Sequence, residues 1–377
     1  MSHIFLASPH MSDEGFEKEY IKEAFDTNWI APLGKNVNEF ENEMVKKTGA
    51  KAAVALSSGT AAIHMALKSI GIKQNDIVFC QSLTFSASAN PIVYEKAIPV
   101  FIDSDESWNM SPDALEKAFE KYKDNLPKAV IVVHLYGLCA RIEEIKNICE
   151  KYDVPLIEDA AESLGTTING QYTGTFGDYG IISFNGNKII TSSGGGMILF
   201  NNDDAKEKAK KVLFWSTQAR EQARHYEHKE IGYNYRMSNI VAGIGRGQLK
   251  VLDQRINKKR YIYEYYQNEF KNIKDIIMMP RDKYGSYSNC WLTTILVNES
   301  SNVKPLDIMV ALEENDIESR PVWKPMHLQP VFNNCDYIDN GSISKCLFDT
   351  GVCLPSDTKL TDEDLKRICQ IIKGLFE

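Results

Sequence analysis

The sequence predicts an α/β protein in which a mainly parallel, seven-stranded sheet is flanked by helices, followed by a smaller C-terminal α+β unit. Two observations support this prediction. Between residues 52 and 200, short apolar runs alternate with helical stretches, a pattern typical of parallel strands covered by helices on both faces. Beyond about residue 270 this alternation stops, and a single apolar run at residues 291–297 precedes two further helical stretches.

The strands expected in the large sheet are seven short apolar runs, several of which end in polar or glycine-containing turns. Ligands bind at the carboxyl ends of strands in α/β sheets, so these turns are where a functional site is expected. The runs are residues 52–56, 77–80, 99–102, 129–133, 155–159, 180–184 and 197–200.

Helical periodicity is expected at residues 61–70, 205–214, 238–270, 305–315 and 359–376. The stretch at residues 238–270 is long enough to connect two domains. We therefore divide the chain into a large domain with an N-terminal arm, residues 1–250, and a small C-terminal domain, residues 251–377.

Composition and charge argue against several classes of protein. Lys and Arg total 43 against 51 Asp and Glu, and a formal charge of -8 argues against a nucleic-acid binder. The N-terminus does not resemble a signal peptide, and no apolar run approaches the ~20 residues of a membrane helix. A cytoplasmic protein without membrane contact is therefore expected. The eight cysteines are scattered, without zinc-type spacing, so no metal site is expected.

One lysine is distinguished by its position between two expected strands. Lys188 follows the run that ends at Phe184 and precedes a turn containing Gly194, Gly195 and Gly196. A lysine in such a turn is expected to be poorly solvated, which favours the neutral amine used in Schiff-base chemistry. Since most lysines are solvated surface residues, this interpretation needs support from other parts of the sequence.

Three further features at strand ends supply that support. Residues 57–60 (Ser-Ser-Gly-Thr) lie where a strand gives way to a helix, which suits phosphate binding but also a plain helix cap. Asp159 ends another strand and could keep a pyridine ring protonated, although an acid there can also be a satisfied helix-start residue. Phe85 offers a flat face for an aromatic ring, or is simply core. Together with Lys188 these features predict a pyridoxal phosphate site, whereas His134 is more typical of a structural residue.

With these residues the sequence resembles the DegT/DnrJ/EryC1/StrS sugar-nucleotide aminotransferases, which have the pyridoxal phosphate-dependent aminotransferase fold of type I. The resemblance covers essentially the whole chain. Its motifs are residues 28–34, 58–62, 84–85, 134–137, 158–162, 183–188, 232–236 and 354–356. Within the family, residues 8–11, 218–221, 225–228 and 320–327 are similar to C4 aminotransferases of bacillosamine-type and exopolysaccharide pathways.

The resemblance implies that Lys188 carries pyridoxal 5'-phosphate as an internal aldimine, with pyridoxamine phosphate as an intermediate, and that Asp159 pairs with the pyridine nitrogen. The other implied cofactor contacts are Gly59, Thr60, Phe85, Glu162, Ser183 and, from a partner subunit, Asn239. The implied nucleotide-sugar pocket contains Asn28, Trp29, Ile30, Ala31, Glu162, Arg320, Trp323, His327 and Phe332. Because the protein is acidic, local cations are expected to recognise the substrates, and the candidates are Arg236, Arg320, Lys324 and His327, each of which could equally be a surface charge.

The implied reaction transfers the amino group of L-glutamate to C4 of a UDP-linked 4-keto-6-deoxy-2-acetamido sugar. Its products would be a UDP-4-amino-4,6-dideoxy sugar and 2-oxoglutarate, for surface glycan or exopolysaccharide synthesis. The resemblance also implies a homodimer with the active site at the subunit interface. A dehydrating branch of the family has histidine in place of the lysine, so Lys188 favours transamination.

Four alternatives stay open at this point. The first is an aminotransferase acting on a dTDP- or GDP-linked sugar, with the keto group at C3 or C4. The second is a decarboxylase or lyase of the same fold, which would release CO2 without a ketosugar acceptor. The third is a non-catalytic regulator that binds pyridoxal phosphate, and the fourth is a scaffold protein with a chance lysine.

Overall fold

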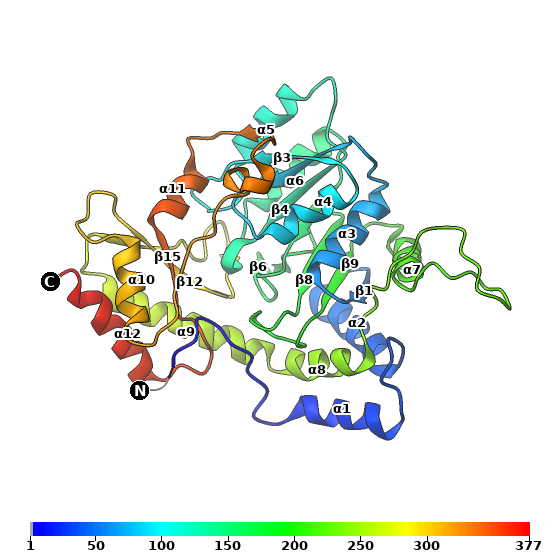
Figure 1. Cartoon of the computed structure of the whole chain (residues 1–377), viewed down its shortest axis with the longest axis horizontal. Coiled ribbons are helices and arrows are strands. Elements are labelled where there is room, and N and C mark those ends of the chain that lie inside the picture. The colour runs from blue at the N-terminus through cyan, green and yellow to red at the C-terminus, as the bar shows by residue number, and fades with distance from the viewer. Residues whose placement is uncertain (1–2) are drawn as a thin grey trace.

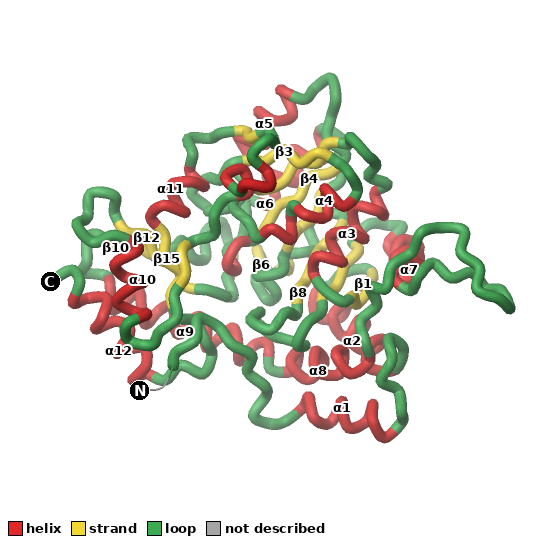
Figure 2. The backbone as a smooth tube through the Cα atoms, in the orientation of Figure 1, coloured by secondary structure: helices red, strands yellow, loops and turns green. Residues whose placement is uncertain are grey.

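The computed structural model describes residues 3–377 and contains the predicted large sheet with helices on both faces (Figures 1 and 2). The strand order across this sheet is β1-β9-β8-β5-β4-β2-β3-β14. All neighbouring strands are parallel except the two pairs that β9 makes with β1 and β8. The strands are β1 (Ala52–Leu56), β2 (Ile77–Gln81), β3 (Ile98–Ile102), β4 (Ala129–Val133), β5 (Leu156–Asp159), β8 (Tyr179–Ser183), β9 (Gly196–Phe200) and β14 (Tyr337–Ile338).

The sheet has one strand more than the seven that the sequence predicts. Strand β14 comes from the C-terminal part of the chain, and its Tyr337 and Ile338 pair with Phe101 and Ile102 of β3. It covers what would otherwise be an open edge of the sheet, where unpaired backbone groups promote association with other chains. A strand of two residues has no periodicity, which explains why the sequence did not reveal it.

Both faces of the large sheet are buried under helices. In β2, Val78 and Cys80 belong to the same apolar cluster as residues of α3, while Ile77 and Phe79 belong to a cluster with α5 on the other face. This double burial explains the continuous apolar runs of the strands. The helices of this part are α1 (Phe16–Asp26), α2 (Lys35–Thr48), α3 (Gly59–Ile70), α4 (Asn90–Tyr94), α5 (Pro112–Lys121), α6 (Ile142–Lys151) and α7 (Ala205–Ser216).

The helical stretch predicted at residues 238–270 is interrupted once. Val251 separates α8 (Asn239–Lys250) from α9 (Leu252–Phe270), which runs towards the C-terminal part of the chain (Figure 1). There, an antiparallel sheet of order β10-β12-β15-β13 shares an apolar core with α9, α10 and α12. The division at residue 250 stays a prediction. The elements are β10 (Ile276–Met278), β12 (Thr293–Val297), β13 (Arg320–Pro321), β15 (Gly351–Leu354), α10 (Pro305–Glu313), α11 (Ile343–Thr350) and α12 (Asp362–Gly374).

A third, small sheet joins the two parts of the chain. Strand β6 (Thr167–Ile168) lies between β7 (Gln171–Tyr172) and β11 (Ser286–Tyr287). The start of the chain also contacts the C-terminal part, because Ile4 forms a bridge with Ile317 and the Ser356 N–H donates to the Leu6 carbonyl (2.7 Å). Between residues 3 and 377, no helix has the length and apolar character needed to cross a membrane.

Candidate active site

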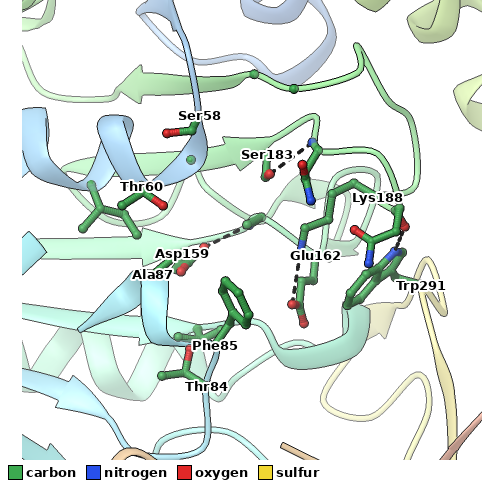
Figure 3. A pocket seen from close by; sticks show the side chains of 18 of the residues that line it. Ser58, Thr60, Thr84, Phe85, Ala87, Asp159, Glu162, Ser183, Lys188 and Trp291 are labelled. Carbon is green, nitrogen blue, oxygen red and sulfur yellow. Dashed lines mark hydrogen bonds and ion pairs between the residues drawn. The ribbon is translucent and has the colours of Figure 1, made fainter. Parts of the chain in front are cut away.

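A cavity of about 330 Å³ lies at the carboxyl ends of the large-sheet strands (Figure 3). Its walls come from the start of α3, the loops after β2 and β5, the segment between β8 and β9, and two tryptophans of the C-terminal part. The cavity brings together all the predicted cofactor residues except Asn239. Segments far apart in the sequence therefore meet at the carboxyl ends of the strands, where parallel α/β folds bind ligands.

Lys188 lies in an irregular segment between β8 and β9, and its side chain is only 12% exposed. Its Nζ is 3.2 Å from Glu162 Oε1 and 4.2 Å from the centroid of the Trp291 ring. The amine thus faces a carboxylate and the face of an aromatic ring within the cavity. These surroundings shelter Lys188 from bulk solvent.

Asp159 ends β5 and is 5% exposed. Its Oδ2 accepts a hydrogen bond from Ser88 Oγ (2.7 Å), and its Oδ1 accepts one from the Ala161 N–H (3.1 Å). Burial raises the pKa of Asp159, and these two hydrogen bonds oppose the rise. A cationic group next to Asp159 would offset the cost of burying its charge.

Glu162 is the second acid of the cavity. Its Oε2 accepts the Tyr136 N–H (2.7 Å), while its Oε1 faces Lys188. Burial raises the pKa of Glu162 to about 7, against the opposing effects of Lys188 and the Tyr136 N–H. Near neutral pH, Glu162 is therefore a group that can hold or release a proton beside the Lys188 amine.

Replacing Glu162 with glutamine is expected to flatten the pH dependence of the stability of the cofactor-free protein. Because folding raises the pKa of Glu162 from 4.5 to about 7, the folded protein binds more protons than the unfolded chain between these values. The free energy of unfolding of the wild type therefore falls as the pH rises through this window, by at most about 3 kcal/mol at about 1.36 kcal/mol per pKa unit. Urea denaturation of both proteins between about pH 5 and pH 8 measures the difference, and parallel profiles would contradict it.

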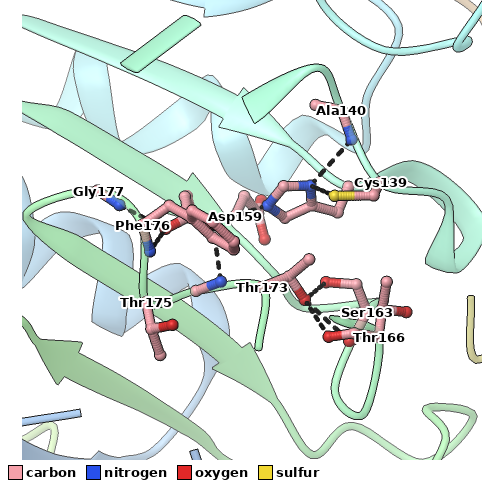
Figure 4. Close-up of polar contacts among 12 residues, drawn as sticks. Cys139, Ala140, Asp159, Ser163, Thr166, Thr173, Thr175, Phe176 and Gly177 are labelled. Carbon is pink, nitrogen blue, oxygen red and sulfur yellow. Dashed lines mark hydrogen bonds and ion pairs between the residues drawn. The ribbon is translucent and has the colours of Figure 1, made fainter. Parts of the chain in front are cut away.

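The neighbouring Glu158 does not line the cavity and has a structural function. Its Oε1 accepts the N–H groups of Phe176 and Gly177 (both 2.6 Å), and its Oε2 accepts the Gly174 N–H (2.8 Å) (Figure 4). His134 Nε2 is 2.9 Å from the same carboxylate. Since His134 Nδ1 accepts the Ala140 N–H (3.2 Å), Nε2 carries the proton that is donated to Glu158. This arrangement agrees with the structural interpretation of His134.

The start of α3 forms a concave backbone surface suited to an anion. Ser58 caps the helix by accepting the Ala61 N–H at its Oγ (3.0 Å), and Gly59 and Thr60 form the first turn next to Ser183 of β8. A Cβ on Gly196 would collide with the backbone of Ser58, so only glycine lets β9 pass this close. The partial positive charge of the helix N-terminus favours a phosphate at this position.

The residues of the cavity fit pyridoxal phosphate. They supply one amine (Lys188), a helix N-terminus with hydroxyl groups, and a buried carboxylate (Asp159) that forms no salt bridge with any residue between 3 and 377. Phe85, which is 57% exposed, borders the same cavity and can cover one face of a ring. A protonated pyridine nitrogen beside Asp159 would provide the missing positive charge.

The predicted residues 28–31 and Asn239 lie together, but outside this cavity. Asn239 Nδ2 donates to the Trp29 carbonyl (2.6 Å), and its backbone N–H donates to the Ala31 carbonyl (2.9 Å). Trp29 and Asn239 line a separate surface groove beside α1 and α2. Within one chain, these residues therefore do not meet Lys188, and the assignment of Asn28, Trp29, Ile30, Ala31 and Asn239 to a shared site stays a prediction.

The structure corrects the prediction for Arg236 and Phe332. Within a single chain, both residues are buried away from the cavity. The Arg236 guanidinium forms an ion pair with Glu41 and donates to the Ala55 carbonyl (3.1 Å). A buried guanidinium needs such partners, so Arg236 is not a free cation in the cavity. Phe332 packs against Phe101 (ring centroids 5.3 Å apart) in the apolar cluster of the sheet, and is core instead of pocket wall.

The remaining predicted substrate residues come from residues 320–327. Trp323 lines the cavity, with its ring centroid 5.4 Å from that of Phe85. His327 does not line it: its Nδ1 is 2.7 Å from Ser82 Oγ, its ring stacks on Tyr337, and burial lowers its pKa. Arg320 is exposed on the edge strand β13, 3.9 Å from Glu318, and does not line the cavity.

Two functional candidates were missed by the sequence analysis. Trp291 lies against Lys188, and Ser88 holds the Asp159 carboxylate. Trp291 belongs to an apolar run that reads as an ordinary strand, more than 100 residues after Lys188. Ser88 lies in a short 3-10 turn after β2, and nothing in its local sequence distinguishes it from other serines.

Comparisons with known proteins match one family over nearly the whole chain. The profile of the DegT/DnrJ/EryC1/StrS aminotransferase family matches residues 11–373. EpsN of Bacillus subtilis (strain 168), named as a pyridoxal phosphate-dependent aminotransferase, is 52% identical over 99% of this chain and 96% of its own. The GDP-perosamine synthase of Vibrio cholerae is 35% identical over 96% of this chain and 97% of its own. The crystal structure of a DegT DnrJ EryC1 StrS aminotransferase from Brucella abortus superposes with a TM-score of 0.87 at 28% identity, covering 96% of each chain.

Proposed function

Because the chain belongs to the DegT/DnrJ/EryC1/StrS aminotransferase family, we propose that it transfers the amino group of L-glutamate to C4 of a UDP-linked 4-keto-6-deoxy-2-acetamido sugar. At the coarser level, the protein is a pyridoxal phosphate-dependent sugar aminotransferase. The observation that carries the proposal is the meeting of Lys188, Glu162 and Asp159 in one cavity next to the N-terminus of α3.

The residues of the cavity divide the work of the reaction. When bound, pyridoxal phosphate supplies an electron sink for the charge left on the donor carbon after its proton departs. Lys188 would hold the cofactor, and its freed Nζ would accept the α-proton of glutamate and later return it. Glu162 orients the amine, since its Oε1 is 3.2 Å from Nζ. Asp159 would keep the pyridine nitrogen protonated, and Gly59, Thr60 and Ser183 would hold the phosphate.

The charge of the cavity supports a homodimer with a shared site. In the part of the chain that the structure describes, Lys188 is the only cation that lines the cavity. The cofactor phosphate, the glutamate carboxylates and the sugar diphosphate all require further positive or hydrogen-bonding groups.

The segment between α7 and α8 projects from the body (Figure 1), and its Tyr226 and Ile231 are each 76% exposed. We propose that a second copy covers this surface and that Asn239 of the partner subunit reaches the cofactor phosphate.

The UDP-linked sugar is supported by residues 8–11 and 320–327, which are similar to C4 aminotransferases of bacillosamine-type pathways. A second candidate has a specific observation in its favour, because a GDP-perosamine synthase is 35% identical along nearly the whole chain. The two candidates share the reaction and differ in the nucleotide. Trp323, beside Phe85 at the cavity wall, is placed where part of the sugar nucleotide could pack.

Incubating the holoenzyme with L-glutamate and UDP-, GDP- or dTDP-linked 4-keto-6-deoxy sugars is expected to give turnover with the UDP-linked 2-acetamido sugar. Mass spectrometry should show one amino group gained per 2-oxoglutarate formed, and NMR should place it at C4. Turnover with the GDP-linked sugar alone would replace the UDP assignment with the GDP alternative. Release of CO2 without any amino sugar would contradict transamination and favour a decarboxylase.

A further inference from the structure

The position of the Lys188 amine is set by its neighbours, because its own segment has no regular structure. Residues 184–195 form neither helix nor strand, and a lysine side chain has many accessible rotamers. Figure 3 shows the Lys188 side chain between Glu162 and Trp291. Its Nζ is 3.2 Å from the carboxylate and 4.2 Å from the ring centroid. A cation is attracted to the face of an indole ring at this distance.

Trp291 is itself fixed by hydrogen bonds around its ring and backbone. Its side chain is 2% exposed, and its indole N–H donates to the carbonyl of Asn187, the residue before Lys188 (2.8 Å). Its backbone N–H donates to Asn289 Oδ1 (2.9 Å), and its carbonyl accepts a hydrogen bond from the buried Lys259 Nζ (3.0 Å). The ring therefore provides a fixed surface and also ties down the backbone that carries Lys188.

Further aromatic rings hold Trp291 on the side of the cavity wall. The centroid of Trp323 is 6.3 Å away and that of Tyr136 is 6.4 Å away. The backbone N–H of Trp323 donates to the Tyr136 hydroxyl (3.1 Å), which links the Tyr136 ring to the segment that carries Trp323. Trp291 thus connects the aromatic wall of the cavity to the amine at its centre.

We propose that Trp291 is a positioning residue that holds the Lys188 amine in the orientation needed for proton transfer. When Nζ accepts a proton from the donor carbon, the amine becomes an ammonium, and the negative face of the indole ring stabilises that charge. The same contact keeps Nζ from turning away before it returns the proton. This inference rests on the proposed role of Lys188 in transamination, and it adds a residue from the C-terminal part of the chain to that step.

The test is site-specific incorporation of 5-fluorotryptophan and of tetrafluorotryptophan at position 291 of the holoenzyme. Fluorine withdraws charge from the ring face but preserves its shape and its N–H group. The rate of the absorbance change on addition of L-glutamate, measured in single turnovers, is expected to fall stepwise with the number of fluorine atoms. The concentration of glutamate that gives half the maximal rate should change little, because the binding contacts are preserved.

The matched control is the same substitution at Trp215. This ring also has lysines over its face, with Lys68 at 5.1 Å and Lys211 at 5.2 Å, and its indole N–H also donates to an acceptor, Glu230 Oε2 (2.8 Å). Trp215 does not line the cavity, so fluorination there should leave the rate unchanged.

Ordinary variants test the same inference independently. Trp291→Phe keeps a ring face, so it is expected to slow the reaction with glutamate less than Trp291→Leu does. In Trp291→Leu the amine loses this contact, and the rate is expected to fall roughly 100-fold, as is typical when a reacting group is misplaced. Rates independent of fluorination at position 291, or equal rates in the two variants, would overturn the inference. A wild-type protein that shows no glutamate-dependent absorbance change would instead overturn the proposed function, and with it this inference.

Discussion

Replacing Lys188 with alanine is expected to abolish amino transfer in both directions, with a loss of at least ~10,000-fold in kcat, as is typical when the central reacting group of an enzyme is removed. Lys188 is the only amine that lines the cavity in the described part of the chain, so no neighbour can replace it as cofactor anchor or as base. The measurements are the visible absorbance of the purified protein and the amount of 2-oxoglutarate released from L-glutamate.

Two further variants serve as controls for Lys188→Ala. Lys188→Arg keeps a positive charge beside Glu162 but has no free amine, so it should be as inactive as Lys188→Ala. Lys250→Ala removes a lysine of α8 that lies over the Phe16 ring and does not line the cavity, so this variant should retain wild-type turnover. Turnover by Lys188→Ala near the wild-type rate would contradict the assignment of this residue.

Replacing Asp159 with asparagine is expected to lower kcat roughly 1,000-fold, which corresponds to about 4 kcal/mol at about 1.36 kcal/mol per factor of ten. The amide has nearly the shape of the carboxylate but carries no charge, so it cannot keep a pyridine nitrogen protonated. Steady-state kinetics with glutamate and the ketosugar measure the loss. Ser88→Ala, which removes the hydrogen bond to Asp159 Oδ2, should give a smaller loss because the charge is retained.

Stability measurements separate this chemical role from a structural one. Because burial raises the pKa of Asp159, the ionised carboxylate is unfavourable in the folded, cofactor-free protein. The neutral amide introduced by Asp159→Asn removes this cost, so the free energy of unfolding of the variant at pH 8 should equal or exceed that of the wild type. A variant that loses activity because it unfolds would contradict the role assigned to Asp159.

Much of the fold could be predicted because its strands have a strong local signal. Seven of the eight strands of the large sheet are mostly buried and read as short apolar runs, and these seven were expected at their positions. The proximity of Gly59, Asp159 and Lys188 followed from the same pattern. Each lies at or just after the carboxyl end of a strand, and in a largely parallel sheet those ends lie on the same side.

Residue type could not reveal which side chains are free to act. Arg236 and His327 were expected to recognise substrates, but one is paired with Glu41 and the other stacks on Tyr337. Phe332 was expected in the pocket, but it packs into the core beside Phe101. In each case the decisive contact comes from a residue distant in the sequence, and local patterns carry no information about such partners.

Local sequence patterns were therefore sufficient to predict the α/β architecture, the family and the proximity of Gly59, Asp159 and Lys188, because apolar periodicity and strand-end motifs are local properties. The way in which the Lys188 amine is held depends on tertiary contacts. Trp291 reaches Lys188 across a separation of more than 100 residues, and Glu162 faces Nζ because the Tyr136 N–H holds its other carboxylate oxygen. Both contacts depend on packing the C-terminal part of the chain and the loops of the large sheet around one cavity, which no local pattern specifies.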